Sequence, residues 1–258
     1  MPHLERDGVG LFYLEAGQGE PYLFGHGAMN DHSWFAPQMD HFSRAHRSVA
    51  VDFRGHGKSD KPHQDYTIEG FADDLSWMAH QLGLEKPVVV GHSMGGAACL
   101  QLAASYPDLP AAVVVLDSPV VPPAAFGSAM GQLAQAVQSP GYQEAIRQFM
   151  SPFVGFQDDP GRAAQMIGEM VAVPQHVTAS VLHNYVRWDS AAAAAAVKAP
   201  VLYVSSGPWF TEVDRFRQLT PQLVTGQTVG SGHYHQLEVP DQINAMIDRF
   251  SVMVAQMA

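Results

Sequence analysis

The sequence predicts an α/β fold built on parallel strands. One observation is the run of three valines at 88–90, which is typical of a buried parallel strand, followed at 96–104 by a helix of small and apolar residues. Another is the alternation of short apolar runs with segments of helical spacing along most of the chain. A chain of 258 residues with 47% hydrophobic and 15% charged residues also suits one globular α/β domain with a substantial core.

Each element follows from a local pattern. Strands are expected where short apolar runs end at glycine, proline or aspartate, and helices where apolar residues recur at helical spacing. Thr67 is a suitable N-cap and Gly83 a suitable stop for the longest early helix. The expected strands are 11–16, 21–24, 47–52, 88–90, 111–116, 201–206 and 224–229. The expected helices are 31–42, 66–82, 96–104, 191–197, 211–219 and 241–253.

A helical insertion is expected at 120–189. The valine-rich runs stop there, and prolines divide the stretch into helical segments. Its flexible apolar side chains are of the kind that line small-molecule pockets. They are Met130, Phe149, Met150, Phe153, Phe156, Met166, Met170 and Trp188.

Residues 91–95 (GHSMG) fit G-x-S-x-G, the pattern of a sharp strand-to-helix turn called a nucleophile elbow. Such a turn holds Ser93 in a strained backbone conformation, and glycines two positions on either side allow the strand and the helix to approach closely. The following helix directs its N-terminal amides and positive dipole end at the serine. The pattern therefore indicates nucleophilic catalysis by Ser93.

Two more loops supply partners for such a serine. Residues 25–28 (GHGA) follow a strand, and their flexible backbone makes the amide of Ala28 a candidate oxyanion donor, with the amide of Met94 as the second. His233 follows Gly232 on a glycine-rich loop after the last strand, where no helix restrains it. A neutral imidazole there is suited to remove the serine proton.

Composition restricts the partners. The net charge of −11 argues against binding to nucleic acid or to an anionic membrane. The single cysteine, Cys99, excludes an internal disulfide, and the first residues lack the apolar run of a signal peptide, so we expect a cytoplasmic protein. No HExxH or CxxC spacing occurs, and we expect no metal and no cofactor. The expected partner is a small-molecule substrate, and a homodimer is left open.

The three motifs at 26–27, 91–95 and 232–233 together resemble the α/β-hydrolase superfamily in order and spacing. The resemblance extends from about Leu11 to Met253. It implies a mostly parallel central sheet flanked by helices, with a helical cap inserted after the sixth strand. The core domain would comprise 1–119 and 190–258, and the cap 120–189. It also implies a triad of serine, acid and histidine in that order. Ser93 distinguishes the chain from dehalogenases and epoxide hydrolases of this fold, which carry aspartate there.

The acid of the triad has three candidates. Family members commonly place it just beyond the penultimate strand, but the first carboxylates after Gly207 are Glu212 and Asp214, which suit the first turn of the next helix. Asp117 ends a central strand 24 residues after Ser93, where haloalkane dehalogenases and zearalenone-type lactonases have their acid. We favour Asp117 and keep Asp214 and then Glu212 as alternatives.

The resemblance implies a serine hydrolase that cleaves an ester or lactone through an acyl-enzyme. The alternative is a cofactor-independent dioxygenase of the same fold that uses the His-Asp pair as a base. His235 competes with His233 for the role of base, whereas His26 and His92 are interpreted as structural. The candidate pocket residues are Trp34, Met150, Phe153, Trp188, Trp209 and Tyr234.

Overall fold

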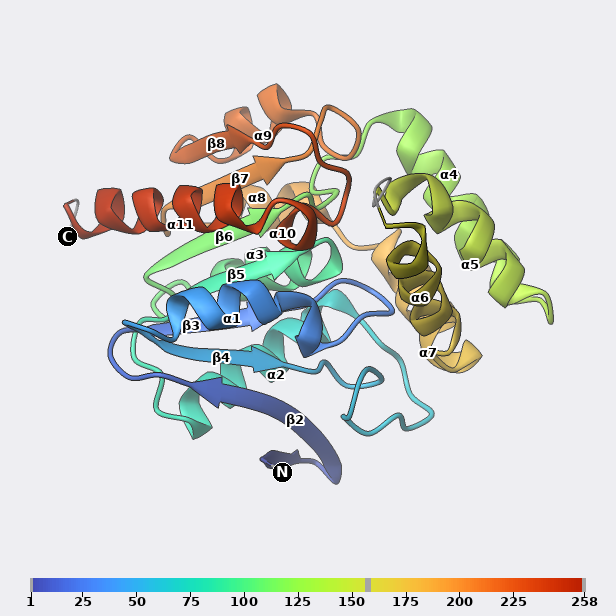
Figure 1. The fold of residues 1–258 in the computed structure, drawn as a ribbon, viewed down its shortest axis with the longest axis horizontal. Helices are drawn as coiled ribbons and strands as arrows, with labels where there is room; N and C mark the ends of the chain where they lie inside the picture. The colour runs from blue at the N-terminus through green and yellow to red at the C-terminus, as the bar shows by residue number, and fades with distance from the viewer. Residues whose placement is uncertain (1, 156–158, 257–258) are drawn as a thin grey trace.

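The computed structural model describes residues 2–155 and 159–256, and its centre is one eight-stranded sheet in the order β1-β2-β4-β3-β5-β6-β7-β8 (Figure 1). The strands from β3 to β8 are parallel to one another, and β2 runs antiparallel to both β1 and β4. The expected α/β fold class is thereby confirmed. The strands are β1 (His3–Arg6), β2 (Val9–Ala16), β3 (Pro21–Gly25), β4 (Arg47–Val51), β5 (Val88–His92), β6 (Ala112–Leu116), β7 (Val201–Ser205) and β8 (Leu223–Gln227).

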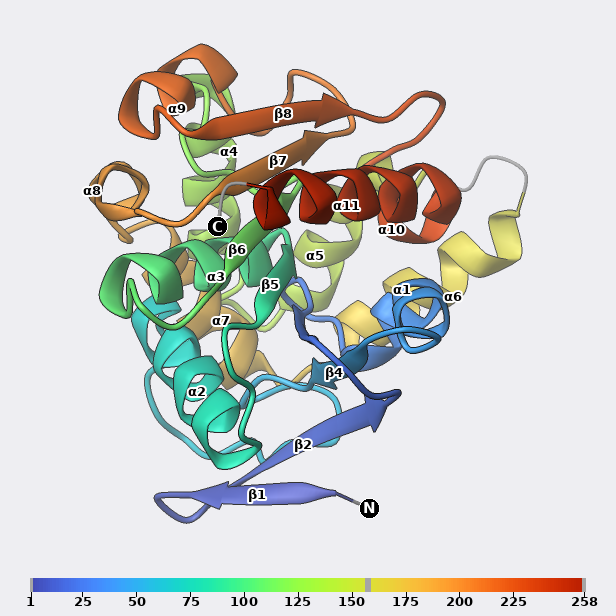
Figure 2. The ribbon, with the colours of Figure 1, turned by 90° about the vertical axis from the view of Figure 1, so that its left-hand side faces the viewer.

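Helices cover both faces of the sheet, as the two perpendicular views show (Figures 1 and 2). One face is covered by α1 (Ala36–Phe42) and the long C-terminal α11 (Pro240–Ala255). The opposite face is covered by α2 (Ile68–Gln81), α3 (Met94–Ser105), α8 (Ser190–Ala196) and α9 (Val213–Leu219). None of the helices described is both long and apolar enough to cross a membrane.

The central strands are apolar on both sides because both sides are buried. In β6, Val113 and Val115 belong to the apolar cluster under α2 and α3, whereas Val114 and Leu116 belong to the cluster under α1 and α11. All four side chains are fully buried. Successive side chains of a strand point to opposite faces, so a strand between two helical layers must be apolar throughout. The continuous valine run therefore places β6 at the centre of the fold.

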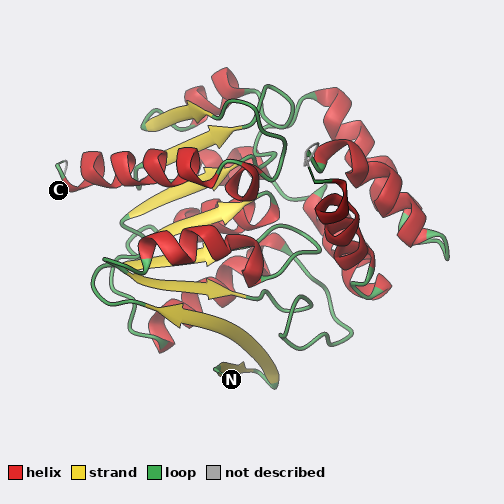
Figure 3. Cartoon of the chain, viewed as in Figure 1, coloured by secondary structure: helices red, strands yellow, loops and turns green. Residues whose placement is uncertain are grey.

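A group of helices follows β6 and lies beyond the carboxyl ends of the parallel strands (Figures 1 and 3). Its members are α4 (Ala124–Ala136), α5 (Tyr142–Met150), the 3-10 turn η2 (Ser151–Phe153), α6 (Pro160–Val171) and α7 (Gln175–Tyr185). Residues that follow β3, β5, β6 and β8 face residues of α4, α5 and α7 across one cavity. Ligands of open α/β sheets bind at this edge, and the helices therefore enclose the place where a site is expected.

Three features were not predicted from the sequence. Strand β1 is short and alternates between exposed and half-buried residues, so it lacks an apolar run. The short helix α10 (His235–Glu238) has too few residues to show a periodicity. The elbow helix begins at Met94 instead of residue 96, because Ser93 occupies the N-cap position of α3.

Candidate active site

Ser93 lies at the turn between β5 and α3 with φ 51° and ψ −118°. The φ value is in the left-handed region, which non-glycine residues rarely adopt, so the turn is strained. Glycines make the turn possible: a Cβ on Gly91 would lie 2.1 Å from the carbonyl oxygen of Gly95, and one on Gly95 would lie 2.0 Å from that of Gly25. The turn thus presents the Ser93 side chain from a backbone that tolerates only glycine two positions before and two positions after the serine.

Asp117 directly follows β6 and is fully buried, again with a left-handed φ of 47°. Its Oδ2 lies 3.0 Å from Nδ1 of His233. Ser206, just beyond β7, donates its backbone N–H to Oδ1 at 2.8 Å and its hydroxyl to Oδ2 at 2.7 Å. The carboxylate accepts from both residues, so it holds the proton of His233 on Nδ1 and leaves Nε2 as the basic nitrogen.

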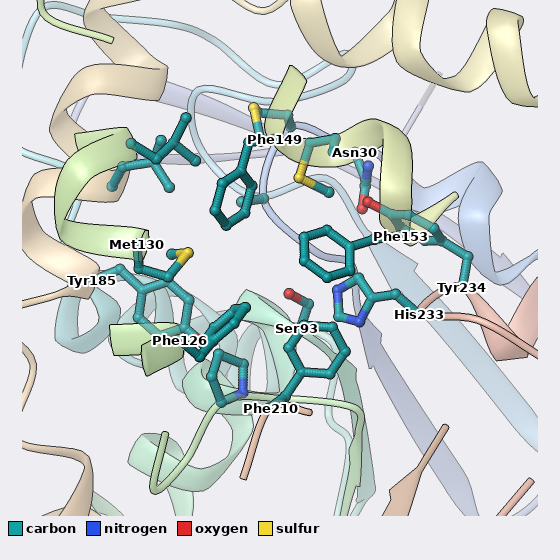
Figure 4. A pocket seen from close by; sticks show the side chains of 16 residues that line it. Asn30, Ser93, Phe126, Met130, Phe149, Phe153, Tyr185, Phe210, His233 and Tyr234 are labelled. Carbon is teal, nitrogen blue, oxygen red and sulfur yellow. The ribbon is translucent and has the colours of Figure 1, made fainter. Parts of the chain in front are cut away.

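Ser93 and His233 line the same cavity, and Figure 4 shows their side chains next to each other. The cavity has a volume of about 40 Å³. Its walls are mainly aromatic and thioether side chains from the sheet loops and the overlying helices. These apolar and aromatic lining residues are Met29, Pro119, Phe126, Met130, Leu133, Phe149, Met150, Phe153, Leu182, Tyr185, Phe210 and Tyr234.

The loop after β3 passes directly beside the serine. A Cβ on Gly27 would lie 3.4 Å from Cβ of Ser93, and the next residue, Ala28, lines the cavity. The backbone of Met94 begins α3 immediately after Ser93. A helix start and a strand-end loop therefore converge near the serine, which is the arrangement that backbone oxyanion donors require.

Residues 21–240 match the family model described as the alpha/beta hydrolase fold. The chain belongs to the α/β-hydrolase fold family. Similar sequences include a 2-(acetamidomethylene)succinate hydrolase of Mesorhizobium japonicum, 40% identical over 109 residues, which are 42% of this chain and 39% of that protein. A bifunctional esterase/perhydrolase of Acinetobacter calcoaceticus is 35% identical over 120 residues, 45% of this chain and 44% of that one. The matches thus span about two-fifths of each relative.

Solved structures of α/β-hydrolases match almost the whole chain. Est816, described as an N-acyl homoserine lactone degrading enzyme, superposes with a TM-score of 0.85 at 26% identity over 96% of this chain and 100% of that one. An enol-lactonase from Burkholderia xenovorans superposes with a TM-score of 0.86 at 21% identity over 97% of this chain and all of the other. At that lower identity the likeness shows the fold alone.

The two alternative acids lie elsewhere in this α/β-hydrolase. Asp214 is in the first turn of α9, where its side chain is 94% exposed and pairs with Arg217 at 2.9 Å. Glu212 occupies the N-cap position of the same helix, and its backbone N–H donates to the carbonyl of Val121. Among the three candidates, it is Asp117 that the structure brings to His233.

The neighbouring histidines are buried and bonded within the fold. His92 contacts the carbonyl oxygen of His233 through Nε2 at 2.9 Å, and burial, followed by the nearby His233, holds its pKa well below the ordinary value. His235 begins α10, where burial lowers its pKa to about 4. His26 donates Nδ1–H to the carbonyl of Gly27 and accepts the N–H of Phe53 at Nε2. Burial lowers the pKa of His26, which suits this neutral pattern.

Three of the six predicted pocket residues, Met150, Phe153 and Tyr234, line the cavity. The three tryptophans lie outside it. Trp34 is buried behind Tyr234, with the ring centroids 5.0 Å apart. Trp188 donates Nε1–H to Oε1 of Gln101 and lines a neighbouring hollow, and Trp209 is 65% exposed. Large apolar side chains suit a pocket wall, a buried core and a protein surface alike, so the sequence did not show that these three tryptophans lie outside the cavity.

The insertion contributes Met130 and Phe149 to the cavity, as its composition suggested, whereas Phe156 lies outside the described residues. Sequence reasoning missed Ser206 and Asn30. Ser206 directly follows β7, the strand that pairs with β6, and Asp117 directly follows β6. The adjacency of these two strand ends is the signal that could have indicated Ser206. Asn30 lines the cavity two residues after Ala28, and only its proximity to the oxyanion loop could have pointed to it.

One group of potential metal ligands has no recognisable spacing in the sequence. Single ligand atoms of Asp31, His32 and Asp52 lie within 4.8 Å of one another. They already have partners in the protein: Asp31 accepts from the backbone and hydroxyl of Ser33, and Asp52 accepts from His32 and from the backbone of Lys58. The contacts between His32 and Asp52 join the loop after β3 to the loop after β4.

Proposed function

We propose that this chain is a serine hydrolase that cleaves an ester or lactone bond, with Ser93 as nucleophile, His233 as base and Asp117 as the acid that orients it. The observation that supports it best is the contact of 3.0 Å between Asp117 Oδ2 and His233 Nδ1, in a cavity that Ser93 shares. Ser93 alone is a weak nucleophile at neutral pH. The buried carboxylate makes the imidazole an effective proton acceptor and stabilises the imidazolium that forms.

In the first half of the reaction, Ser93 Oγ attacks the carbonyl carbon while its proton passes to Nε2 of His233. The carbonyl π electrons move to oxygen, and the amides of Ala28 and Met94 donate to that oxyanion. The tetrahedral intermediate then collapses, the carbon–oxygen bond to the alcohol breaks, and the imidazolium returns the proton to the leaving oxygen. For a lactone, that oxygen remains attached to the acyl chain. Each oxyanion donor would lower the barrier by about 3 kcal/mol, as in comparable sites.

In the second half, water attacks the acyl-enzyme ester. His233 removes one water proton, the same two amides stabilise the second oxyanion, and Ser93 leaves with the proton that the imidazolium donates. The net change is the addition of one water across the ester bond. This route needs no cofactor, because a buried carboxylate, a neutral imidazole and backbone amides supply all of the acid–base and electrostatic steps.

The similar proteins support this bond class. One relative is named as an esterase/perhydrolase, and a neighbour at 26% identity is described as degrading a lactone. The cavity is lined mainly by apolar and aromatic side chains, which suits an uncharged ester or lactone. The alternative, cofactor-independent dioxygenation, would use the His-Asp pair but would not need a nucleophilic serine.

The test is a kinetic screen of p-nitrophenyl acetate, p-nitrophenyl butyrate and γ-butyrolactone with the wild type and Ser93→Ala. We expect the wild type to hydrolyse members of this panel and Ser93→Ala to lose several orders of magnitude in kcat. Circular dichroism on both proteins would establish that the variant is folded. Near-native turnover by Ser93→Ala would contradict the acyl-enzyme. Oxygen consumption with aromatic substrates that persists in Ser93→Ala would favour the dioxygenase.

A further inference from the structure

A second apolar hollow adjoins the cavity of Ser93, and the reaction described above does not use it. This neighbouring hollow has a volume of about 100 Å³, against about 40 Å³ for the cavity. The two share four lining residues, Pro119, Phe126, Met130 and Tyr185, so these side chains form the partition between them. The other residues that line the neighbouring hollow come from the segments around the start of α4 and between α7 and α8, and they are Pro122, Gly127, Val186, Trp188 and Ser190.

The partition is built from side chains that can move. Phe126 and Met130 lie one turn apart on α4, so both project from the same side of that helix, and both are half-buried. Methionine is unbranched and has three rotatable side-chain bonds, which lets it adapt to the shape of a ligand. The cavity and the neighbouring hollow can therefore join by side-chain rotation alone, without a shift of the sheet.

The direction of proton transfer decides which part of an ester faces the partition. His233 returns its proton to the leaving oxygen, so the alcohol part must lie on the side of His233. Figure 4 shows Ser93 between His233 on one side and Phe126, Met130 and Tyr185 on the other. With the leaving group toward His233, the acyl chain extends from the carbonyl carbon toward the partition and the neighbouring hollow behind it.

The two volumes indicate how long that chain is. A water-sized group requires about 10–15 Å³ of such volume, so the cavity holds about three such groups and the neighbouring hollow about seven to ten more. An acyl chain of more than about four carbons must then pass the partition.

The lining of the neighbouring hollow indicates that the chain is aliphatic. Of the described residues that line it, none carries a charge. The indole N–H of Trp188 already donates to Oε1 of Gln101 at 2.7 Å, so it is not a free donor for a polar group. Apolar walls of this kind favour a hydrocarbon chain over a charged or amide-bearing one.

We propose that the neighbouring hollow binds the end of an aliphatic acyl chain, so that the enzyme selects esters with acyl chains of about six to ten carbons over acetates and butanoates. The proposal rests on the proposed function, since it places the ester carbonyl at Ser93. Each methylene that passes from water into an apolar site improves binding by about fourfold. Longer chains should therefore raise kcat/KM until the neighbouring hollow is filled.

Two glycines of α4 provide a matched pair of variants. Gly127 lines the neighbouring hollow, and a Cβ built on it meets nothing within 4 Å. Gly131, one turn further along, is equally unobstructed but lines a separate groove between α4 and α7. Gly127→Phe and Gly131→Phe thus make the same change on the same helix, and only Gly127→Phe should place a ring in the neighbouring hollow.

The experiment measures kcat/KM for p-nitrophenyl octanoate and p-nitrophenyl butanoate, which share one leaving group and have nearly equal carbonyl reactivity. In the wild type the octanoate-to-butanoate ratio should be about 10 to 100, because four methylenes at about fourfold each set a limit of about 250. Gly127→Phe should lower the ratio by about tenfold or more, and Gly131→Phe should leave it within twofold. Thermal unfolding would show that both variants are folded. A wild-type ratio near 1, a change of less than threefold in Gly127→Phe, or an equal loss in Gly131→Phe would overturn the proposal.

A second pair of esters tests the acyl assignment. Octyl acetate and butyl acetate carry the same difference in length on the alcohol side. Their ratio of kcat/KM should change by less than threefold in Gly127→Phe. A loss as large as that in the acyl series would overturn the assignment of the neighbouring hollow to the acyl chain.

A binding measurement keeps this test separate from the proposed chemistry. Calorimetry on Ser93→Ala and on Ser93→Ala/Gly127→Phe would compare 2-nonanone with 2-pentanone, ketones that carry the octanoyl and butanoyl chains without a leaving group. A preference for 2-nonanone that Gly127→Phe abolishes supports the proposal even if no ester is hydrolysed. Equal affinities in Ser93→Ala, or a preference that Gly127→Phe leaves intact, would overturn it even if hydrolysis succeeds.

Discussion

Replacing Asp117 with asparagine removes one charge from the pair with His233 and keeps nearly the same shape. The backbone N–H of Ser206, 2.8 Å from Oδ1, can still donate to the asparagine oxygen. The other end of the side chain changes from an acceptor into an NH₂ donor. That end lies 3.0 Å from Nδ1 of His233, so Nδ1 must now accept a hydrogen bond and the imidazole proton moves to Nε2.

The expected loss follows from that change of tautomer. Nε2 is the nitrogen that would accept the Ser93 proton, and once protonated it cannot. The corresponding change in serine proteases lowers kcat by about 10⁴, which is about 5.5 kcal/mol of activation free energy. We expect a similar loss here because Asp117 is fully buried, where solvent cannot replace its charge.

The matched control is Asp214→Asn, the same chemical change on a side chain that is 94% exposed. Its kcat should remain within about twofold of the wild type, because an exposed pair with Arg217 contributes little. The assay is steady-state hydrolysis of the best ester of the panel, with thermal unfolding to show that both variants are folded. A kcat for Asp117→Asn above one-tenth of the wild type, or a large loss in Asp214→Asn, would refute the assignment of the acid.

Three further outcomes are expected. His233→Ala should lose several orders of magnitude in kcat, whereas folded His235→Ala should keep most of its activity, and the reverse order would show that the base is misassigned. Gly95→Ala should lower Tm sharply, because the new Cβ would lie 2.0 Å from the backbone oxygen of Gly25. Gly168→Ala is the control: nothing lies within 4 Å of its new Cβ, and the higher helix propensity of alanine should raise the free energy of unfolding by up to about 1 kcal/mol. Equal Tm values for the two variants would contradict the elbow geometry. Burial lowers the pKa of His56 to about 3 and that of His235 to about 4, so below pH 6.5 the unfolded chain binds more protons than the folded one. From pH 6.5 to pH 5 the free energy of unfolding should thus fall by about 2 kcal/mol for each of these two histidines. Urea titrations that give the same free energy of unfolding at pH 6.5 and at pH 5 would contradict this.

The fold could be predicted because its decisive signals are local. The valines of β5 and β6 indicate buried parallel strands, and the G-x-S-x-G pattern marks the turn between β5 and α3. Gly91 is required by contacts within that turn, and Gly95 by the close approach of Gly25 at the end of β3. Strand β1 escaped prediction because an edge strand with alternating exposure needs no apolar run.

The site could be predicted only where the fold motif fixes a residue's position. Ser93 and Ala28 belong to loops of recognisable pattern, and both line the cavity. The contact between Asp117 and His233 joins residues 116 positions apart, so the sequence indicated it only through strand-end placement. The positions of side chains from the insertion, such as Trp188, depend on how separate helices pack against one another. The periodicity of the sequence does not determine that packing.

Covalent labelling tests the central claim most directly. Purified protein is treated with diethyl p-nitrophenyl phosphate, digested, and mapped by mass spectrometry, with residual esterase activity measured in parallel. The account predicts one phosphorylated residue per chain, Ser93, with activity lost in proportion to labelling and little labelling in His233→Ala. Label on another residue, or full labelling of Ser93 with activity retained, would contradict Ser93 as the nucleophile.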